Sequence, residues 1–481
     1  MTKQKNFWCD FYHLTTAQTF WREDMHNQTD TFEMYIRKNP FKGGYTMAAG
    51  LAPVLEWLNK PRYSESQIKK LAKMKYKSGR PMFDPAFLEF IRNEPFQVSV
   101  KAVREGDLVF PNEPIVQVSG PKWQVLMVET AILNAINASS LIATKTSRIV
   151  RAANGRPVSE YGLRRMQELY GLNISRSAFV GGVSATSNVD AGLEYKMDLS
   201  GTHPHAYVMS FENEYRAFHT WLKHNPENPT LLIDTNNTIN GAKIAIRAAR
   251  DLGIDAINVR LDSGDMAHLS REVRKLFDAA GMPNSKIVAS NDLDEYSIES
   301  LIAQGAKIDI FGVGTNMVTA ADQPALGGVY KIKRMGSVDK IKFSEDPIKT
   351  TIPGATETIR MLDSNGNFDG DVILSTANAF TASGTLQREV ISIDPQTGRA
   401  KTFPIGTQYY KPSGYVVKNG VVDKTEMKRS VKSIAKFGRE NLNRLDESHK
   451  RLLNAHRYIA GIEDGLYRYQ QKLINQNQKG A

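Results

Sequence analysis

The sequence contains very little cysteine, since Cys9 is the only one among its 481 residues. A single thiol excludes a disulfide framework within the chain and a zinc site built from cysteines. A chain of this length can bury a full hydrophobic core without covalent cross-links. We therefore expect a protein of a reducing compartment.

Long hydrophobic runs are absent as well. No window approaches the roughly 18 consecutive apolar residues of a membrane span. The first residues, MTKQKNFWCD, lack the apolar core of a signal peptide. These absences predict a cytoplasmic protein without a membrane partner.

The excess of positive charge is modest. Lysine and arginine number 62 and aspartate and glutamate 51, so the formal net charge is +11. This excess permits anionic ligands without identifying them. It is the one sequence feature that favours a non-catalytic phosphate- or nucleic-acid-binding protein. A channel for single-stranded nucleic acid would need dense Lys/Arg runs with interleaved aromatic residues, which the sequence lacks. We expect no nucleic-acid partner.

The middle of the chain carries a series of short apolar runs, each rich in Val and Ile and each ending in polar residues. They are separated by roughly 20–30 residues, enough for one helix and its loops, as in the β/α units of a parallel sheet. The runs are PVSEYG, TLLID, INVRLDSGD, KIVASND and IDIFGVGT. Because the carboxyl ends of parallel strands face the ligand, these polar ends are expected to form one active site at the top of a barrel.

A further stretch, GTHPHAYVMSFENEYRAF at residues 201–218, is expected to be a buried strand. It would deliver His203 and His205 into the same polar pocket, on one face of the strand because they lie two residues apart. For His203, a satisfied core histidine is an equally open reading.

Three regions of the chain differ in the secondary structure that their sequence patterns predict. Residues 1–122 have a helix pattern in GLAPVLEWL and antiparallel strand patterns in FQVSVKAV and EPIVQVSG, which indicate an open α/β domain. Residues 123–333 begin with a long helical pattern and contain the expected β/α barrel. Residues 334–481 form a C-terminal extension of short strands, including a hairpin with the turn DPQTG, followed by basic helices. The helix face formed by Met427, Val431 and Ile434 is expected to pack on the protein rather than on a membrane.

Nine motifs, in order along the chain, resemble the nicotinate phosphoribosyltransferase family. They are DFYHLT, EPIVQVSGP, SEYGLRR, ATSNVDAG, GTHPHAYV, RLDSGD, ASNDLDEY, FGVGTNMVT and PALGGVYK. The resemblance implies an irregular β/α barrel of the type II phosphoribosyltransferase kind, with an open α/β N-terminal domain. It also implies an enzyme that joins nicotinate to phosphoribosyl pyrophosphate, with ATP as co-substrate and Mg²⁺ as cofactor, and a homodimer with shared active sites. A nicotinamide-preferring relative is the nearest alternative.

The resemblance assigns the phosphoribosyl substrate to the ends of three strands. In RLDSGD, Asp262 is expected to hold the ribose hydroxyls and Mg²⁺, whereas Asp265 is better explained as a helix N-cap. Asn291 and Asp292 would hold the ribose or its diphosphate, although capping of the next helix explains them equally well. The remaining expected phosphate-binding residues are Arg260, Gly312, Gly314 and Thr315; a GxGT by itself also suits an ordinary tight turn.

His205 aligns with the family histidine that ATP phosphorylates. A neutral imidazole is nucleophilic near neutral pH and forms a labile phosphoryl bond. We therefore expect His205, together with Asp262, to be catalytic.

Base recognition is expected to use aromatic rings and a cation. By resemblance, Tyr161 and Tyr12 stack on the pyridine ring, Tyr12 coming from the other subunit, and Arg164 and Ser187 meet the carboxylate. Core tyrosines and a surface arginine are the alternatives, and the adjacent Arg165 is expected to be a surface residue. Because the nicotinamide-using relatives carry an aspartate where Ser187 stands, serine favours nicotinate.

The helix segment IATKTSRIV carries a basic pair, Lys145 and Arg148. By resemblance this pair reaches phosphates, either within its own subunit or across the dimer interface. A solvated helix face explains it equally well.

Overall fold

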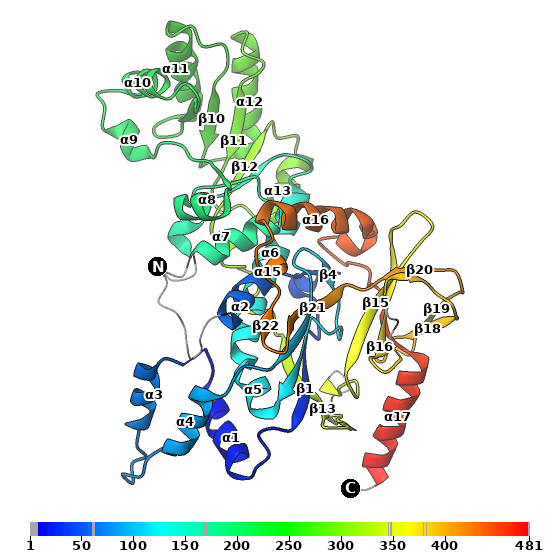
Figure 1. The fold of residues 1–481 in the computed structure, drawn as a ribbon. Coiled ribbons are helices and arrows are strands. Elements are labelled where there is room, and N and C mark those ends of the chain that lie inside the picture. Colours follow the sequence, from blue (N-terminus) through cyan, green and yellow to red (C-terminus); the bar gives the residue numbers. More distant parts are fainter. Residues whose placement is uncertain are drawn as a thin grey trace. The chain divides into compact units, whose positions relative to one another are not determined.

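The computed structural model describes residues 8–59, 63–166, 171–344, 346, 349–378, 380 and 382–479. The chain forms two compact units (Figure 1). The first unit combines Met1–Leu141 with Ala325–Ala481, and the second is Ile142–Pro324. The domain boundaries predicted at residues 122 and 333 stay a prediction. Both outer segments, residues 1–122 and 334–481, lie in the first unit.

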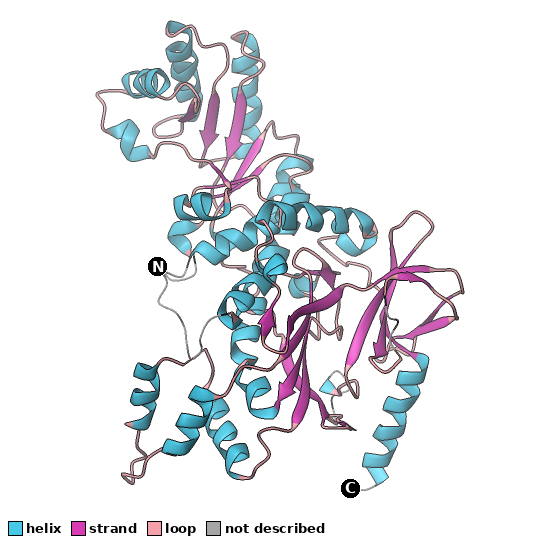
Figure 2. Cartoon of the chain, in the orientation of Figure 1, coloured by secondary structure: helices cyan, strands magenta, loops and turns pink. Residues whose placement is uncertain are grey.

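The first unit contains two large sheets (Figure 2). The first is antiparallel and has the order β14-β13-β1-β5-β3-β21-β22. Its strands are β1 (Thr29–Tyr35), β3 (Ser99–Val103), β5 (Val116–Pro121), β13 (Val329–Met335), β14 (Val338–Asp339), β21 (Ser413–Lys418) and β22 (Val421–Val422). The antiparallel pairing predicted for residues in FQVSVKAV and EPIVQVSG is confirmed by the β3–β5 ladder.

The second sheet of this unit comes entirely from the C-terminal segment and has the order β17-β20-β15-β16-β23-β18-β19. Its strands are β15 (Thr356–Leu362), β16 (Phe368–Ser375), β17 (Gly384–Thr385), β18 (Val390–Ile393), β19 (Ala400–Phe403), β20 (Gln408–Tyr410) and β23 (Ala460–Glu463). The predicted hairpin around DPQTG is confirmed by the antiparallel pairing of β18 and β19. A separate small ladder joins β2 (Thr46–Met47) and β4 (Leu108–Val109).

Helices complete the first unit. They are α1 (Phe11–Arg22), α2 (Leu51–Leu58), α3 (Glu65–Ala72), α4 (Pro85–Asn93), α5 (Lys122–Met127), α15 (Lys424–Met427), α16 (Val431–Arg444) and α17 (Asp464–Lys479), with the 3-10 turns η1 (Pro40–Lys42) and η5 (Glu447–Lys450). Val431 and Ile434 of α16 are buried, so this basic helix packs on the protein through its apolar face, as predicted. Met427, predicted on the same face, ends the separate helix α15 and is only partly buried.

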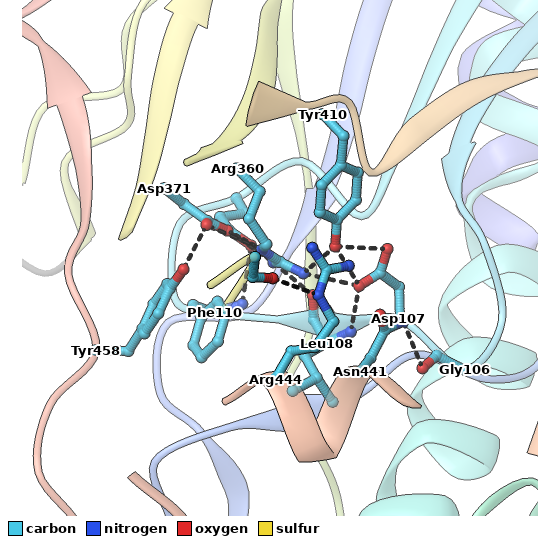
Figure 3. Close-up of polar contacts among 12 residues, drawn as sticks. Gly106, Asp107, Leu108, Phe110, Arg360, Asp371, Tyr410, Asn441, Arg444 and Tyr458 are labelled. Atoms are coloured by element: carbon cyan, nitrogen blue, oxygen red, sulfur yellow. Dashed lines mark hydrogen bonds and ion pairs between the residues drawn. The ribbon is translucent and has the colours of Figure 1, made fainter. Parts of the chain in front are cut away.

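A buried polar network ties the N-terminal segment of this unit to its C-terminal segment (Figure 3). The guanidinium of Arg360 in β15 donates to Asp107 Oδ1 at 2.7 Å and to both carboxylate oxygens of Asp371. Tyr458 donates to Asp371, and Tyr410 to Asp107. The charged groups are sequestered from water but almost all hydrogen-bonded, as buried charges require.

A long helix, α6 (Glu129–Ala152), continues from α5 after a break at Val128 and leads into the second unit. Within the described residues, one helical stretch, Lys122–Ala152, is long and apolar enough to cross a membrane, and 61% of its most apolar window is buried inside the protein. The core helix of a soluble protein passes the same test.

The second unit is built on an all-parallel sheet with the order β8-β7-β6-β12-β11-β10-β9. Its strands are β6 (Val158–Glu160), β7 (Ala185–Thr186), β8 (Asp198–Leu199), β9 (Thr230–Leu232), β10 (Asn258–Leu261), β11 (Lys286–Ala289) and β12 (Ile310–Val313). The five predicted apolar runs form β6, β9, β10, β11 and β12. In the part of the chain that the structure describes, β8 and β9 are not paired with each other, so the barrel is open.

Helices follow the strands of this sheet. They are η2 (Leu163–Arg165), α7 (Gly171–Val180), α8 (Val189–Tyr195), α9 (His205–Met209), α10 (Glu214–His224), α11 (Thr238–Asp251), α12 (Met266–Ala279), α13 (Glu295–Ala303) and α14 (Thr315–Val318). Figure 1 shows α10, α11 and α12 around β10 and β11. The core between them contains Phe218, Ala245, Val259 and Phe277, all fully buried.

The strand predicted over residues 201–218 was wrong. Residues 201–204 form a loop, α9 begins at His205 and α10 at Glu214. Pro204 has no N–H for a strand ladder and stands at the N-cap of α9. Asn213 accepts a hydrogen bond from Arg216 N at 2.9 Å, which starts a second helix, and the buried Phe218 and Leu222 follow at helical spacing.

Candidate active site

A cavity of about 400 Å³ opens at the carboxyl ends of the parallel strands in the second unit. It is lined by Tyr161, Arg164, Arg165, Ser187, Gly201, Thr202, Arg260, Asp262, Ser290, Asn291, Asp292, Gly312, Gly314 and Thr315. These residues lie in or directly after β6, β7, β8, β10, β11 and β12. The expected convergence of polar strand ends is confirmed for the runs that form β6, β10, β11 and β12, whereas Asp234 at the end of TLLID is not among the lining residues.

Arg260 in β10 holds neighbouring strand ends together. Its Nε donates to Ser290 Oγ at 2.9 Å, one terminal nitrogen donates to Thr202 Oγ1 at 2.8 Å, and the other lies 3.0 Å from Asp262 Oδ1. Ser290 also donates to Asp262 Oδ1. The guanidinium is thus fixed in direction by bonds to three strand ends, as a preorganised anion site requires.

The two carboxylates of RLDSGD have different surroundings, and the predicted N-cap role of Asp265 is confirmed. Asp265 Oδ1 accepts the hydrogen bond of His268 N at 2.9 Å and caps α12. Asp262 lines the cavity, and its Oδ2 makes no hydrogen bond with any described residue. One oxygen of Asp262 therefore remains available to a ligand.

A buried carboxylate that sequence reasoning missed, Asp234, lies between Asp262 and His205. Its side chain is 1% exposed, and Oδ2 accepts hydrogen bonds from Asp262 N at 2.8 Å and Ser263 Oγ at 2.7 Å. Its Oδ1 lies 3.9 Å from His205 Nε2 and has no hydrogen-bond partner. His205 itself does not line the cavity but is linked to its wall through Asp234.

The two histidines have different surroundings. The side chain of His205 is 41% exposed, and its Nδ1 lies 3.0 Å from Thr235 Oγ1, so its ring is open to a reagent. His203 is buried against Tyr207 and Trp221, and its Nε2 accepts the hydrogen bond of Leu232 N. Burial lowers the pKa of His203 to about 4. His203 is therefore a neutral core histidine, the alternative that the sequence left open.

Tyr161 packs on two glycines at the end of β12, Gly312 within the strand and Gly314 directly after it. A Cβ atom at Gly312 would lie 2.5 Å from Cε2 of the Tyr161 ring, and one at Gly314 would lie 3.2 Å from the Tyr161 carbonyl oxygen. The Tyr161 hydroxyl is 2.9 Å from Ser200 Oγ. The two glycines are thus needed for the close approach of this loop, a packing reason that the GxGT pattern alone did not reveal.

The base-recognition residues predicted on β6 and β7 meet at one side of the cavity. Arg164 and Arg165 lie in η2 and both are exposed, and Ser187 follows β7. Within the described residues, neither arginine is paired with a carboxylate. Arg165, predicted to be a surface residue, also lines the cavity. Three arginines against two aspartates give the cavity wall an excess of positive charge.

Asn291 and Asp292 lie in a strained turn at the end of β11. Their φ angles are +92° and +36°, which non-glycine residues rarely adopt, and Asn316 donates to the Asp292 carbonyl at 2.8 Å. Neither caps the next helix, because Asp294 is the residue that accepts the N–H of Ser297 at the start of α13. The capping alternative is excluded, and both side chains face the cavity.

The basic pair in α6 lies elsewhere. Lys145 Nζ is 2.7 Å from Glu295 Oε2 and 2.6 Å from Asp322 Oδ2, and Arg148 Nε is 2.8 Å from Glu295 Oε1. Both cations are buried, so the solvated reading was wrong. Neither lines the cavity, because both are held by the buried Glu295, and phosphate binding by them stays a prediction.

Tyr12 belongs to the first unit, on α1, where half of its side chain is exposed. It is not among the residues that line the cavity. Stacking of the Tyr12 ring on a base stays a prediction.

The sequence missed the cavity residues Gly201, Thr202 and Ser290. Ser290 directly precedes Asn291 in KIVASND and was visible there as a polar strand end. Thr202 was hidden because residues 201–218 were read as a strand. Asp234 ends the run TLLID and carried the same signal as Asp262.

Three family models match the chain. The nicotinate phosphoribosyltransferase N-terminal domain matches residues 7–137, the nicotinate phosphoribosyltransferase family model matches residues 157–350, and the C-terminal domain of the same enzymes matches residues 356–470.

Proteins similar in sequence are named nicotinate phosphoribosyltransferases as well. The chain is 39% identical over 373 residues to a nicotinate phosphoribosyltransferase of Bacillus subtilis, covering 76% of this chain and 75% of that protein. It is 32% identical over 419 residues to that of Homo sapiens, covering 74% and 77%.

Solved structures agree. The fold matches the crystal structure of human nicotinic acid phosphoribosyltransferase with a TM-score of 0.80 and 26% identity, over 96% of this chain and 99% of that one. A nicotinate-nucleotide pyrophosphorylase from Pyrococcus furiosus shares the fold, with a TM-score of 0.68, 21% identity and coverage of 92% and 97%. The predicted type II phosphoribosyltransferase fold is confirmed. The chain belongs to the nicotinate phosphoribosyltransferase family.

Proposed function

We propose that this enzyme joins nicotinate to phosphoribosyl pyrophosphate, forming nicotinate mononucleotide and pyrophosphate in the salvage of NAD. One observation carries the proposal: a single cavity combines an aromatic ring and two unpaired arginines at one side with an arginine–aspartate cluster at the other. The substrates need this combination, because one carries a carboxylate on an aromatic ring and the other a sugar with several phosphates.

In the reaction, the pyridine nitrogen attacks the anomeric carbon of the sugar. A C–N bond forms, the C–O bond to the diphosphate breaks, and pyrophosphate leaves with the electron pair. Positive charge develops on the sugar as the bond breaks. The carboxylate of Asp262, held by Arg260 and Ser290, is positioned to stabilise that charge and to bind the ribose hydroxyls.

The phosphates are assigned to the ends of β11 and β12. The amide and carboxylate of Asn291 and Asp292 bind the ribose and its diphosphate neighbours, and Gly312, Gly314 and Thr315 bind the 5′-phosphate through backbone N–H groups. Arg260 adds the cation.

The residues present fit a magnesium ion that is shared with substrate. No group of three or more His, Cys, Asp or Glu side chains in the described part of the chain could hold a metal alone. Mg²⁺ commonly uses one or two carboxylates and completes its shell with substrate phosphates and water. Asp262, with its free Oδ2, would hold it, and the ion would neutralise charge on the departing pyrophosphate.

The base is recognised at the end of β6 and β7. Tyr161 stacks on the pyridine ring, and Arg164 pairs with the carboxylate beside the hydroxyl of Ser187. Among the described residues no carboxylate pairs with Arg164, which supports this assignment, because a guanidinium already bound to an aspartate would be less available. A nicotinamide-preferring enzyme would gain nothing from this charge.

ATP is the proposed co-substrate, and His205 its phosphoryl acceptor. An imidazole nitrogen attacks the γ-phosphorus, a P–N bond forms, and ADP leaves with the electrons of the broken P–O bond. Water later hydrolyses the phosphohistidine to phosphate. The exposure of the ring and the buried Asp234 beside it support this role, since the carboxylate stabilises an imidazolium. Asp234 also binds the Asp262 backbone, so the two sites are physically linked.

We further propose a cytoplasmic homodimer in which Tyr12 of one copy completes the base site of the other. The half-exposure of this ring on α1 supports the proposal. Mixing inactive Tyr12→Ala protein with inactive Asp262→Ala protein tests the idea, because a hybrid dimer would contain one intact site. Activity well above that of either parent supports sharing, and no recovery in verified hybrids contradicts it.

The reaction is tested by one assay. Protein is incubated with phosphoribosyl pyrophosphate, Mg²⁺ and either nicotinate or nicotinamide, with and without ATP, and mononucleotide and pyrophosphate are measured. Mononucleotide formed from nicotinate, faster with ATP, supports the proposal. Preference for nicotinamide, or no pyrophosphate release, contradicts it.

A further inference from the structure

Glu160, the last residue of β6, is a buried carboxylate directly beneath the base side of the cavity. Its side chain is fully buried, and it does not line the cavity. Within the described residues no lysine, arginine or histidine pairs with it. Its two oxygens are satisfied by uncharged donors alone.

Those donors come from three separate segments. Oε1 accepts the backbone N–H of Gly162, which lies between Tyr161 and the η2 turn. Oε2 accepts Thr186 Oγ1 at 2.7 Å and Ser175 Oγ at 3.0 Å. In addition, the Glu160 carbonyl accepts the N–H of Ser187 at 2.9 Å.

A second residue fixes the direction of these bonds. Asn188 donates to Ser175 Oγ at 3.1 Å through its side chain and to Thr186 Oγ1 at 3.0 Å through its backbone. Each hydroxyl has one proton, and with Asn188 supplying a donor to it, that proton points to Glu160. Glu160 must therefore accept at both oxygens.

We propose that Glu160 is the positioning residue for base recognition: it locks the Tyr161–Arg164 loop and Ser187 into one arrangement. The idea rests on the proposed function, because it assigns the base to this side of the cavity. The Arg260–Asp262 cluster is held by Ser290, Thr202 and Asp234 rather than by Glu160, so phosphoribosyl binding should change much less than base binding.

Glu160→Gln tests the proposal, because glutamine has nearly the same shape but replaces one acceptor with an N–H donor. It therefore meets either Gly162 N–H or the two hydroxyl protons with the wrong group. We expect the KM for nicotinate to rise about 10-fold or more, while the KM for phosphoribosyl pyrophosphate changes by less than about 2-fold.

A second variant tests the same network with a smaller disturbance of the fold. Ser175→Ala removes one donor to Glu160 from outside the cavity, and a smaller rise in the nicotinate KM is expected. In the Glu160→Gln background the same change should add less than it does in the wild type, because both variants break one network.

Glu33→Gln is the matched control. Glu33 in β1 of the first unit is also a buried carboxylate, accepting from Thr356 N at 2.6 Å and Gln117 Nε2 at 2.9 Å, although unlike Glu160 it also pairs with Lys333 at 3.1 Å. It should lower the melting temperature without separating the two KM values. An equal change of both KM values in Glu160→Gln, or no change in either, overturns the inference. A wild type that does not use nicotinate contradicts the proposed function itself, and this inference with it.

Discussion

Arg360 and Asp371 form a bidentate ion pair in the interior of the first unit (Figure 3). Nε of Arg360 lies 2.9 Å from Oδ1 and 3.0 Å from Oδ2, and one terminal nitrogen lies 2.7 Å from Oδ2. Both side chains are fully buried. In this geometry a guanidinium makes two parallel hydrogen bonds to a carboxylate. The pair stabilises the fold only while both members are present, because loss of one leaves the other as a buried charge without compensation.

Replacing Arg360 with methionine should therefore destabilise the protein strongly. The substitution leaves Asp371 and Asp107 as buried carboxylates without their cation, so we expect the free energy of unfolding to fall by about 3–5 kcal/mol. Urea denaturation measures the change. Arg468→Met is the control, since Arg468 is 73% exposed in its pair with Asp464 and should cost less than about 1 kcal/mol. Equal effects of the two variants would contradict the prediction.

Glu113, whose Oε2 lies 3.9 Å from a terminal nitrogen of Arg360, gives the same network a dependence on pH. Burial, and then the charge of Asp371, raise the pKa of Glu113 well above its ordinary range. The folded protein thus keeps a proton that the unfolded chain releases. This contribution to stability is complete below the unfolded pKa of about 4.3 and is lost as the pH rises toward the folded pKa.

Glu113→Gln, which replaces the O–H donor of the protonated carboxyl with an uncharged N–H donor that does not titrate, should remove this loss of stability. Above about pH 4.3, the wild-type free energy of unfolding is expected to fall relative to the variant by about 1.4 kcal/mol per pH unit, until the folded pKa is reached. Denaturation of both proteins at several pH values measures the difference. A difference that does not vary with pH would show that Glu113 is ionised in the folded protein.

His205→Ala should separate ATP use from phosphoribosyl transfer. We expect the variant to lose ATP hydrolysis and acid-labile phosphorylation but to keep a slow synthesis without ATP, because Asp262 and Arg260 remain in place. Labelling with γ-phosphate-labelled ATP detects the phosphoenzyme. Phosphohistidine that persists in the variant would assign the acceptor to another residue.

Asp262→Ala should lower turnover by roughly 100-fold or more with the fold intact, because it removes the carboxylate that faces the sugar. Asp265→Ala is the matched control in the same loop. Loss of its cap should cost about 1 kcal/mol of stability and leave turnover nearly unchanged. Near-normal turnover of well-folded Asp262→Ala protein would make Asp262 a structural residue.

Ser187→Asp should shift the choice of base. Pairing of Arg164 with the nicotinate carboxylate is expected to be worth roughly 1.5–3 kcal/mol, hence about a ten- to hundredfold preference over nicotinamide. A new carboxylate at residue 187 repels the acid and accepts from the amide. The ratio of kcat/KM for the two bases should move toward nicotinamide, and an unchanged ratio would exclude Ser187 from the base pocket.

The parallel strands of the second unit were predictable because each is a Val- and Ile-rich run that ends in a polar cluster, as in INVRLDSGD. Periodicity shows where such a strand ends, and topology then brings the ends together. The segment at 201–218 failed the same reading, since Pro204 and Asn213 divide it into helices. Only some of its apolar residues are buried, such as Val208 and Phe218, whereas Met209 is exposed.

Partners distant in the sequence could not be predicted. Arg148 and Lys145 look like a solvated or phosphate-binding pair until Glu295, 147 residues beyond Arg148, is placed between them. The structural role of Gly312 likewise depends on the Tyr161 ring, which comes from another strand. Composition shows that a cation or a glycine is present, but only the fold shows what it touches.

The division of the first unit between the two ends of the chain has a consequence for synthesis on the ribosome. Residues 142–324 are complete before any of residues 325–481 exist, so the parallel-sheet unit can fold while the first unit cannot. Until then the first sheet has only β1, β5 and β3, with both outer edges open because β13 and β21 are still to be made. Arg360, the ion-pair partner of Asp107, is synthesised 253 residues after it. A nascent chain that stalls near residue 324 would therefore expose strand edges to chaperones and proteases, and truncated products should be cleared rather than accumulate as half-enzymes.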